Sequence, residues 1–265
     1  MQPDEGAAEQ RRAKVICEEA RLNPDAQKFV TGNGYQIRSG QEQAAQKGTN
    51  IQFPRTAVEI KADWIPASDF AQPGFSCSSP QTAVYTEMID GTCYALAGLH
   101  ISSKLWPNWI WATFEPQNPQ TNPNRCVAFG PCHDKWGATP STSTGGNTTL
   151  TQPLNELMTQ ANLPAALRNY RMDGVQIAFG TKQNPTLLGN SVIEGENVGM
   201  QKGTASCITC HSVSTIQTDG TDGIKLIDNQ VGPKFVPPKG WIARDFVWSL
   251  ALACPKGIQA CAPAK

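Results

Sequence analysis

Between residues 53 and 115 the chain alternates short apolar stretches with turn residues. Four stretches are rich in β-branched and aromatic residues and bounded by Pro, Gly, Asn or Ser: TAVEIKADWI (56–65), AVYTEMI (83–89), CYALAGLHIS (93–102) and WIWATFE (109–115). This pattern predicts strands of an antiparallel sheet. Asp90-Gly91 is a two-residue hairpin signal of the type I′ kind between the second and third strands. RMDGVQIAF (171–179) predicts a further strand.

Few helices are predicted. Residues 1–50 are polar and rich in Gln, Ala and Gly, with one expected helix at 7–22. Residues 151–170 predict one or two helical turns followed by a helix, with Pro at a permitted starting position. RDFVWSLALA (244–253) predicts a C-terminal helix. Residues 116–150 hold many Pro, Asn, Gly, Ser and Thr, and they predict a long surface excursion.

Charge and hydropathy argue against nucleic-acid binding and against a membrane span. Lys plus Arg and Asp plus Glu both number 22, so the net charge is zero, and the chain has no basic run of the kind that binds nucleic acid. No segment approaches 18 continuous apolar residues, so we expect no membrane span. The N-terminus has charge but no apolar core of a signal peptide. We therefore expect a mature exported chain from which the signal peptide is missing.

Nine cysteines point to an oxidising compartment. Six of them form pairs that are close in sequence, which predicts the disulfides Cys77–Cys93, Cys126–Cys132 and Cys254–Cys261. The seven cysteines other than Cys207 and Cys210 permit many other pairings, and Cys17 is left over. We expect an exported protein that is periplasmic or secreted.

The motif C-x-x-C-H occurs once, at Cys207, Cys210 and His211. In c-type haem attachment the two thiolates add to the vinyl groups and the histidine becomes an iron ligand, so the chemistry uses all three residues. A thioredoxin-type dithiol would need a preceding βαβ unit, and a structural zinc site would need a second ligand pair. Cys126-x₅-Cys132-His133 is the only such pair, and its spacing is wrong.

The motif resembles that of the c-type cytochromes. GLHISSKLWPNWIWATFEP, LRNYRMDGVQ, LLGNSVIEG and SCITCH together are similar to a group of bacterial proteins labelled only "cytochrome c family protein". The resemblance implies one covalent haem c and export, but no reaction. In the small class I cytochromes c the motif lies near the N-terminus and a Met ligand follows. Here no Met or His follows His211, so we expect a different fold.

We expect an α+β fold, with an antiparallel β-rich domain and a C-terminal helical segment that attaches the haem. The expected organisation is a polar segment at 1–50 and a single haem-binding domain at 51–265. Within that domain, 51–200 is β-rich, and 201–265 holds the attachment motif and the C-terminal helix.

The second axial ligand of the iron must come from upstream, or the position is open. The candidates are His100, His133, Met88, Met158, Met172 and Met200. Met158 and Met172 lie in apolar patterns typical of core methionines. Met200 is flanked by glycines, in a stretch typical of a surface loop, and His133 lies in the Pro-rich excursion.

We expect His100 opposite the iron. On a strand, Tyr94, Leu96, Gly98, His100 and Ser102 would share one face, and Trp109, Trp111, Thr113 and Glu115 would share one face of the next strand. If these faces coincide, an imidazole, a carboxylate and two indoles meet on one wall. His100 would then be an iron ligand, or an acid–base group together with Glu115. A hydrogen-bonded core histidine and an ordinary carboxylate are the alternatives.

Three functions are compatible with these residues. The first is an electron carrier that meets a redox partner protein. The second is a haem enzyme with an open or weakly ligated iron that acts on peroxide, a small oxide or an organic molecule. The third is a haem sensor or a subunit of a redox complex. Most single C-x-x-C-H proteins carry electrons, whereas the large β region and the missing downstream ligand favour an enzyme.

Overall fold

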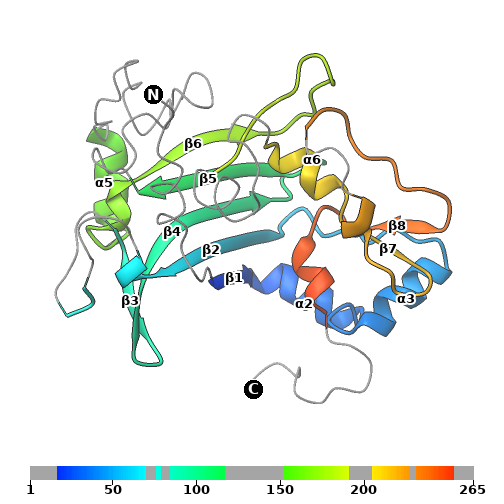
Figure 1. Ribbon diagram of the computed structural model, residues 1–265, viewed down its shortest axis with the longest axis horizontal. Coiled ribbons are helices and arrows are strands. Elements are labelled where there is room, and N and C mark those ends of the chain that lie inside the picture. Colours follow the sequence, from blue (N-terminus) through cyan, green and yellow to red (C-terminus); the bar gives the residue numbers. More distant parts are fainter. Residues whose placement is uncertain are drawn as a thin grey trace, which may run out of the picture.

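A six-stranded antiparallel sheet dominates the fold (Figure 1). The computed structural model describes residues 17–69, 76–78, 84–116, 152–190, 205–226 and 231–253. Five strands follow the order β1-β2-β4-β5-β6, and β3 pairs with β4. Their bounds are β1 (Cys17–Leu22), β2 (Val58–Pro66), β3 (Thr86–Ile89), β4 (Thr92–Ser103), β5 (Ile110–Pro116) and β6 (Tyr170–Gln176). The sheet and the few helices confirm the expected α+β class.

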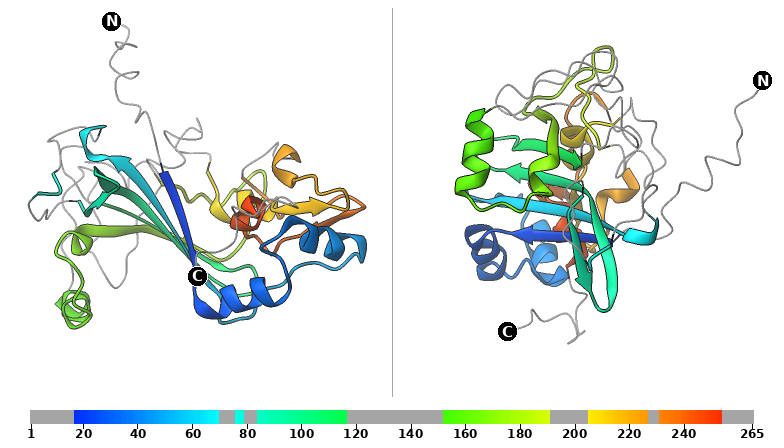
Figure 2. Two further views of the ribbon diagram at one scale, coloured as in Figure 1. Left: turned by 90° about the horizontal axis from the view of Figure 1, so that it is seen from below. Right: turned by 90° about the vertical axis from the view of Figure 1, so that its left-hand side faces the viewer.

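A smaller group of elements lies at one end of the sheet (Figure 1). It contains α2 (Pro24–Gly32), α3 (Arg38–Gln46), α6 (Cys207–Ser212), β7 (Thr215–Gln217) and β8 (Trp241–Ala243). Helix α5 (Gln152–Gln160) lies at the opposite end of the sheet, and Figure 2 shows how strongly the sheet twists between the two ends. The motif at 207–211 is therefore close to one end of the sheet and far from α5.

The strands match the alternation in the sequence. All five predicted strands are present, and β3 and β4 form the predicted hairpin, with Ile89 opposite Thr92. Asp90 and Gly91 have φ values of 47° and 79°, the left-handed backbone that a type I′ turn requires. The hairpin prediction is confirmed.

The helix predictions were less accurate. Residues 17–22 form an edge strand rather than the end of a helix, because they pair with β2 along its length. The segment 151–170 has the reverse order from that expected: α5 comes first and a 3₁₀ turn, Leu167–Asn169, follows. Only Trp248–Leu252 of the expected C-terminal helix is helical, as a 3₁₀ turn. Asp245 and Phe246 cannot join it because both have positive φ.

Residues 17–50 pack into the same core as the residues that follow them. Besides β1, this segment contributes Ala26 and Val30 of α2 and Ala44 and Ala45 of α3 to the apolar cluster that also contains Ile208 of α6. Asn23 caps α2 by accepting a hydrogen bond from the Ala26 amide at 3.1 Å. The small alanine side chains let these two short helices approach the centre of the molecule.

The disulfide Cys77–Cys93 is present, as predicted. Cys17 has a free, exposed thiol. The expected pairs Cys126–Cys132 and Cys254–Cys261 lie outside the described residues, as does the excursion at 116–150 apart from Pro116.

A β-bulge in β4 changes which of its residues lie on each face of the sheet. Asp63 pairs with Gly98, whereas Trp64 pairs with Leu96, so Ala97 is an extra residue. The alternation reverses at this point. Gly98, His100 and Ser102 lie on one face, but Leu96 lies on the other face in an apolar cluster with Trp64. The expected single face from residue 94 to residue 102 is therefore wrong for residues 94 and 96.

No helix within the described ranges is long and apolar enough to cross a bilayer.

Candidate functional site

Helix α6 presents the two cysteines of the motif one turn apart. Cys207 is buried and Cys210 is partly exposed. The Cys207 thiol donates a hydrogen bond to the Leu188 carbonyl at 3.3 Å. The expected helical attachment segment is confirmed over Cys207–Ser212.

A backbone carbonyl fixes the orientation of His211. Nδ1 of His211 lies 2.7 Å from the Phe246 carbonyl oxygen. A carbonyl oxygen only accepts, so Nδ1 carries the proton and Nε2 is the nitrogen with a lone pair available to a metal. A second hydrogen bond of this kind is usual for histidines that bind metals.

The turn that carries this carbonyl has a strained backbone. Asp245 and Phe246 have φ values of 52° and 73°, and neither is glycine. Two consecutive left-handed residues are costly and persist only where their surroundings hold them. The Asp245 carboxylate does so: it accepts hydrogen bonds from the Phe53 amide at 2.8 Å and from Lys104 at 2.5 Å.

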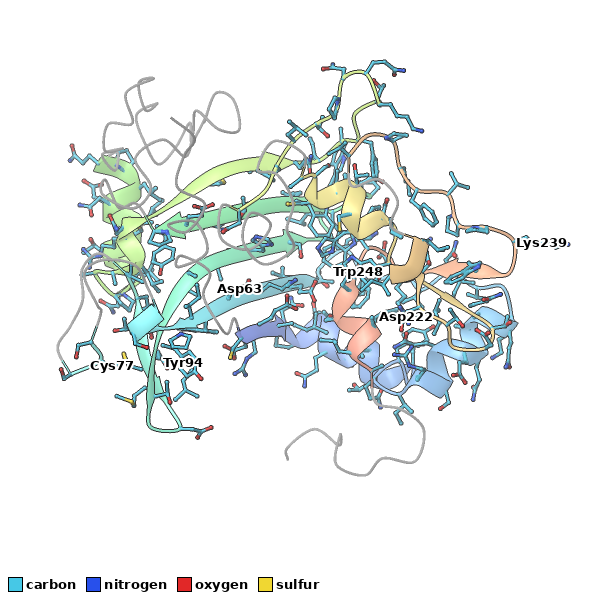
Figure 3. All side chains as sticks on the ribbon, in the orientation of Figure 1. Asp63, Cys77, Tyr94, Asp222, Lys239 and Trp248 are labelled. Atoms are coloured by element: carbon cyan, nitrogen blue, oxygen red, sulfur yellow. A yellow bond between two sulfur atoms is a disulfide. The ribbon has the colours of Figure 1, made fainter. Side chains whose placement is uncertain are left out.

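A buried arginine supports the same turn from the other side. Arg244 is fully buried, and its guanidinium donates to Gln41 at 2.7 Å and to the Thr215 carbonyl at 3.0 Å, and pairs with Asp222. Asp222 also pairs with Arg38 of α3 at 2.6 Å. Figure 3 shows Asp222 near Trp248, among the elements at this end of the sheet. Helix α3 and β7 thus hold the start of the turn.

Contacts to the sheet place α6 over one end of its polar face. The Gln176 side chain, at the end of β6, accepts a hydrogen bond from the Ile208 amide at 2.9 Å and donates one to Ser206 at 3.0 Å. The Trp111 ring of β5 lies against the His211 imidazole, with 4.4 Å between ring centroids. The imidazole therefore sits at the sheet surface rather than at the periphery.

His100, Trp111 and Glu115 share that face of the sheet. His100 pairs with Thr113 and Ser102 pairs with Trp111, so the faces of β4 and β5 coincide, as the sequence pattern suggested. Glu115 is fully buried and lies two residues beyond Thr113 on the same face. Trp109 does not join them: it precedes β5 with a φ of 63°, and its side chain packs against Phe53 in the apolar core.

Strand β2 adds charged residues that the sequence reasoning did not identify. Glu59, Lys61 and Asp63 lie on the same face, because Lys61 pairs with His100 and Asp63 with Gly98. Glu59 and Asp63 are buried, and Lys61 forms an ion pair with Glu18 of β1 at 2.7 Å. The wall is thus a buried polar surface shared by four strands. Alternation within β2 was the available signal.

Burial dominates the electrostatics of this wall. Burial, and to a smaller extent the charge of Lys61, lowers the pKa of His211 to about 3. The pKa of His100 is also lowered to about 3, by burial, by Lys61 and by the charge of His211. Both imidazoles are therefore neutral near pH 7, which is the form that binds a metal.

The other candidate ligands that the structure describes are not near His211. Met88 is exposed on β3 and Met158 is on α5, and both elements are far from α6 (Figure 1). Helix α5 has no buried residue, so Met158 is not a core residue as expected. Met172 pairs with Phe114, on the face opposite to His100. His133 and Met200 lie outside the described residues.

Two alternative interpretations of the cysteines find no support within the described residues. These residues contain no group of three or more His, Cys, Asp or Glu side chains that could hold a metal ion on their own. The sheets are antiparallel, and α6 follows only an isolated parallel bridge between Leu188 and Ser206, so no βαβ unit precedes the cysteines.

The described residues fit a covalent haem. Two cysteines lie one helical turn apart, a neutral imidazole follows them, and its Nδ1 is occupied, which leaves Nε2 for iron. Comparison with protein-family models, curated proteins and solved structures finds no match for this chain. The assignment of the site therefore depends on its own chemistry.

Proposed function

We propose that this protein is an exported monohaem c-type cytochrome that transfers electrons to or from a redox partner protein. One haem c per chain is attached through Cys207 and Cys210, and His211 is an iron ligand. The observation that carries the proposal is the hydrogen bond from Nδ1 of His211 to the Phe246 carbonyl, made by the histidine of a C-x-x-C-H motif.

When bound, the haem supplies an iron that gains or loses one electron. The protein's own residues orient the ligand. Phe246 holds the His211 ring in one tautomer, and the Trp111 ring packs against it. A ligand held in this way needs little rearrangement when the iron changes its charge, which favours electron transfer. The disulfide Cys77–Cys93 supports maturation in an oxidising compartment such as the periplasm.

Expression in a host that matures c-type cytochromes in its periplasm tests the attachment. The intact mass of the protein should exceed the chain mass by one haem, and the haem should stay with the protein in acid–acetone. The variant Cys207→Ala with Cys210→Ala should lose it, whereas Cys17→Ser, which removes an exposed thiol elsewhere, should keep it. Haem that passes into the organic layer from the unmodified protein would refute the proposal.

A haem enzyme is a second candidate, and the buried polar wall favours it. A simple carrier needs no wall of His100, Glu115, Glu59, Lys61 and Asp63 on the side of the sheet that faces His211. If the iron is open on its far side, His100 and Glu115 would be acid–base groups for a small molecule such as a peroxide.

His100→Ala separates the two candidates, with His133→Ala as the matched histidine control. If His100 ligates the iron, the variant changes from a low-spin to a high-spin spectrum, and the carrier is supported. If His100 is near an open iron, the spin state stays the same while peroxide turnover or ligand affinity falls. A His133→Ala variant that reproduces either change would show that His100 is the wrong residue.

A further inference from the structure

Asp63 is the least compensated charged group in the described part of the chain. It lies on β2 (Figure 3). It is fully buried, and neither carboxyl oxygen has a hydrogen-bond partner in the structure. A buried carboxylate without hydrogen-bond donors is strongly destabilised relative to the protonated acid. Burial accordingly raises the pKa of Asp63 to about 7, the charge of Lys61 lowers it, and that of Glu18 raises it slightly. Near neutral pH, small changes of nearby charge decide whether this group is protonated.

Asp63 is on the face that the proposed haem site uses. It lies two residues from Lys61, whose charge acts on Asp63, on His100 and on His211. The other titratable groups of this face are Glu18 of β1, Glu59 of β2 and Glu115 of β5. Lys61 is paired with Glu18, so its charge is already partly neutralised. Asp63 is the carboxyl among them whose two oxygens are both without a partner in the structure.

We propose, on the basis of the proposed haem function, that Asp63 takes up a proton when the haem iron is reduced. A one-electron donor protein supplies the electron, which converts ferric to ferrous iron, and solvent supplies the proton, which binds a carboxylate oxygen of Asp63. The added electron removes one positive charge from the site, and the proton restores it. In a low-dielectric environment this compensation favours the paired transfer over transfer of the electron alone.

The reduction potential of the haem-bearing protein, titrated optically with redox mediators at several pH values, tests this inference. The potential should decrease with rising pH around neutrality, because the oxidised protein loses the Asp63 proton more readily than the reduced one. Asp63→Asn should abolish this decrease, and Glu156→Gln, which removes an exposed carboxylate on α5, should retain it. A reduced-minus-oxidised infrared spectrum should contain a protonated-carboxyl band that disappears in Asp63→Asn.

A second variant keeps the inference testable if Asp63→Asn folds poorly. Lys61→Gln removes the positive charge that lowers the pKa of Asp63, so the pH range of the decrease should move upward. A haem-bearing Asp63→Asn protein with the pH dependence of the unmodified protein overturns this inference and leaves the proposed function intact. A Lys61→Gln protein in which the potential decreases over the same pH range as in the unmodified protein also overturns this inference and leaves the proposed function intact. A protein that attaches no haem overturns both.

Discussion

Replacing Asp63 by Asn should change how the free energy of unfolding depends on pH. The pKa of this buried carboxyl is raised from 3.8 to about 7, mainly by burial. Below about pH 4 the group is protonated in both the folded and unfolded chain, so it has no effect on stability. Between about pH 4 and about pH 7 only the unfolded chain loses the proton, and the folded state loses about 1.4 kcal/mol per pH unit. The accumulated loss is about 4 kcal/mol above pH 7, and it is constant from there.

Urea unfolding followed by tryptophan fluorescence, from about pH 5 to about pH 8, measures this loss. Asp63→Asn cannot ionise, so its stability should decrease less over this range, by about 3 kcal/mol, than that of the unmodified protein. Glu156→Gln controls for the loss of one negative charge at an exposed position. Parallel pH profiles for Asp63→Asn and the unmodified protein would show that Asp63 is already ionised at low cost in the folded state.

Three further changes test other parts of the fold. Replacing Cys77 and Cys93 by Ser should lower the free energy of unfolding by about 3 kcal/mol, because the bond closes a loop with a sequence separation of 16; unchanged urea midpoints with and without reductant would contradict this. Asp222→Asn should cost about 3 kcal/mol or more, since it leaves the buried guanidinium of Arg244 without its anionic partner; calorimetry should show the melting temperature falling accordingly. Gly91→Ala should cost about 1 kcal/mol through its φ of 79°, and an unchanged melting temperature would show that the hairpin turn rearranges freely.

The sheet could be predicted from the sequence because local signals determine it. Alternation gave the strands, Asp90-Gly91 gave the hairpin, and the spacing of Cys77 and Cys93 gave the disulfide. Residues 17–22 were expected to be helical because nothing local shows that β2 would pair with them. Tertiary pairing outweighed their high helix propensity, which comes from Glu, Ala, Arg and Leu.

The candidate site was predictable where the motif was contiguous and hidden where distant segments build it. The contiguous C-x-x-C-H motif is recognisable in the sequence, and period-two alternation predicted that His100 and Glu115 lie on one face. The carbonyl that binds His211 was not foreseeable, since it depends on positive φ at Phe246, in a segment that looked like the start of a helix. Asp63 was missed because an isolated acidic residue in a strand normally points to solvent.

The extra residue Ala97 makes β4 two strands of opposite phase joined end to end. The positions that require apolar side chains should therefore have opposite parity before and after Ala97. Before Ala97, even-numbered positions such as Leu96 should demand apolar side chains, and after it, even-numbered positions such as His100 should accept polar ones. Deleting Ala97 would make Leu96 and Gly98 consecutive, so both would keep their faces and their partners Trp64 and Asp63, whereas deleting a residue elsewhere in β4 would move part of the strand to the wrong face. A screen of single deletions along β4 would locate this phase boundary from function alone.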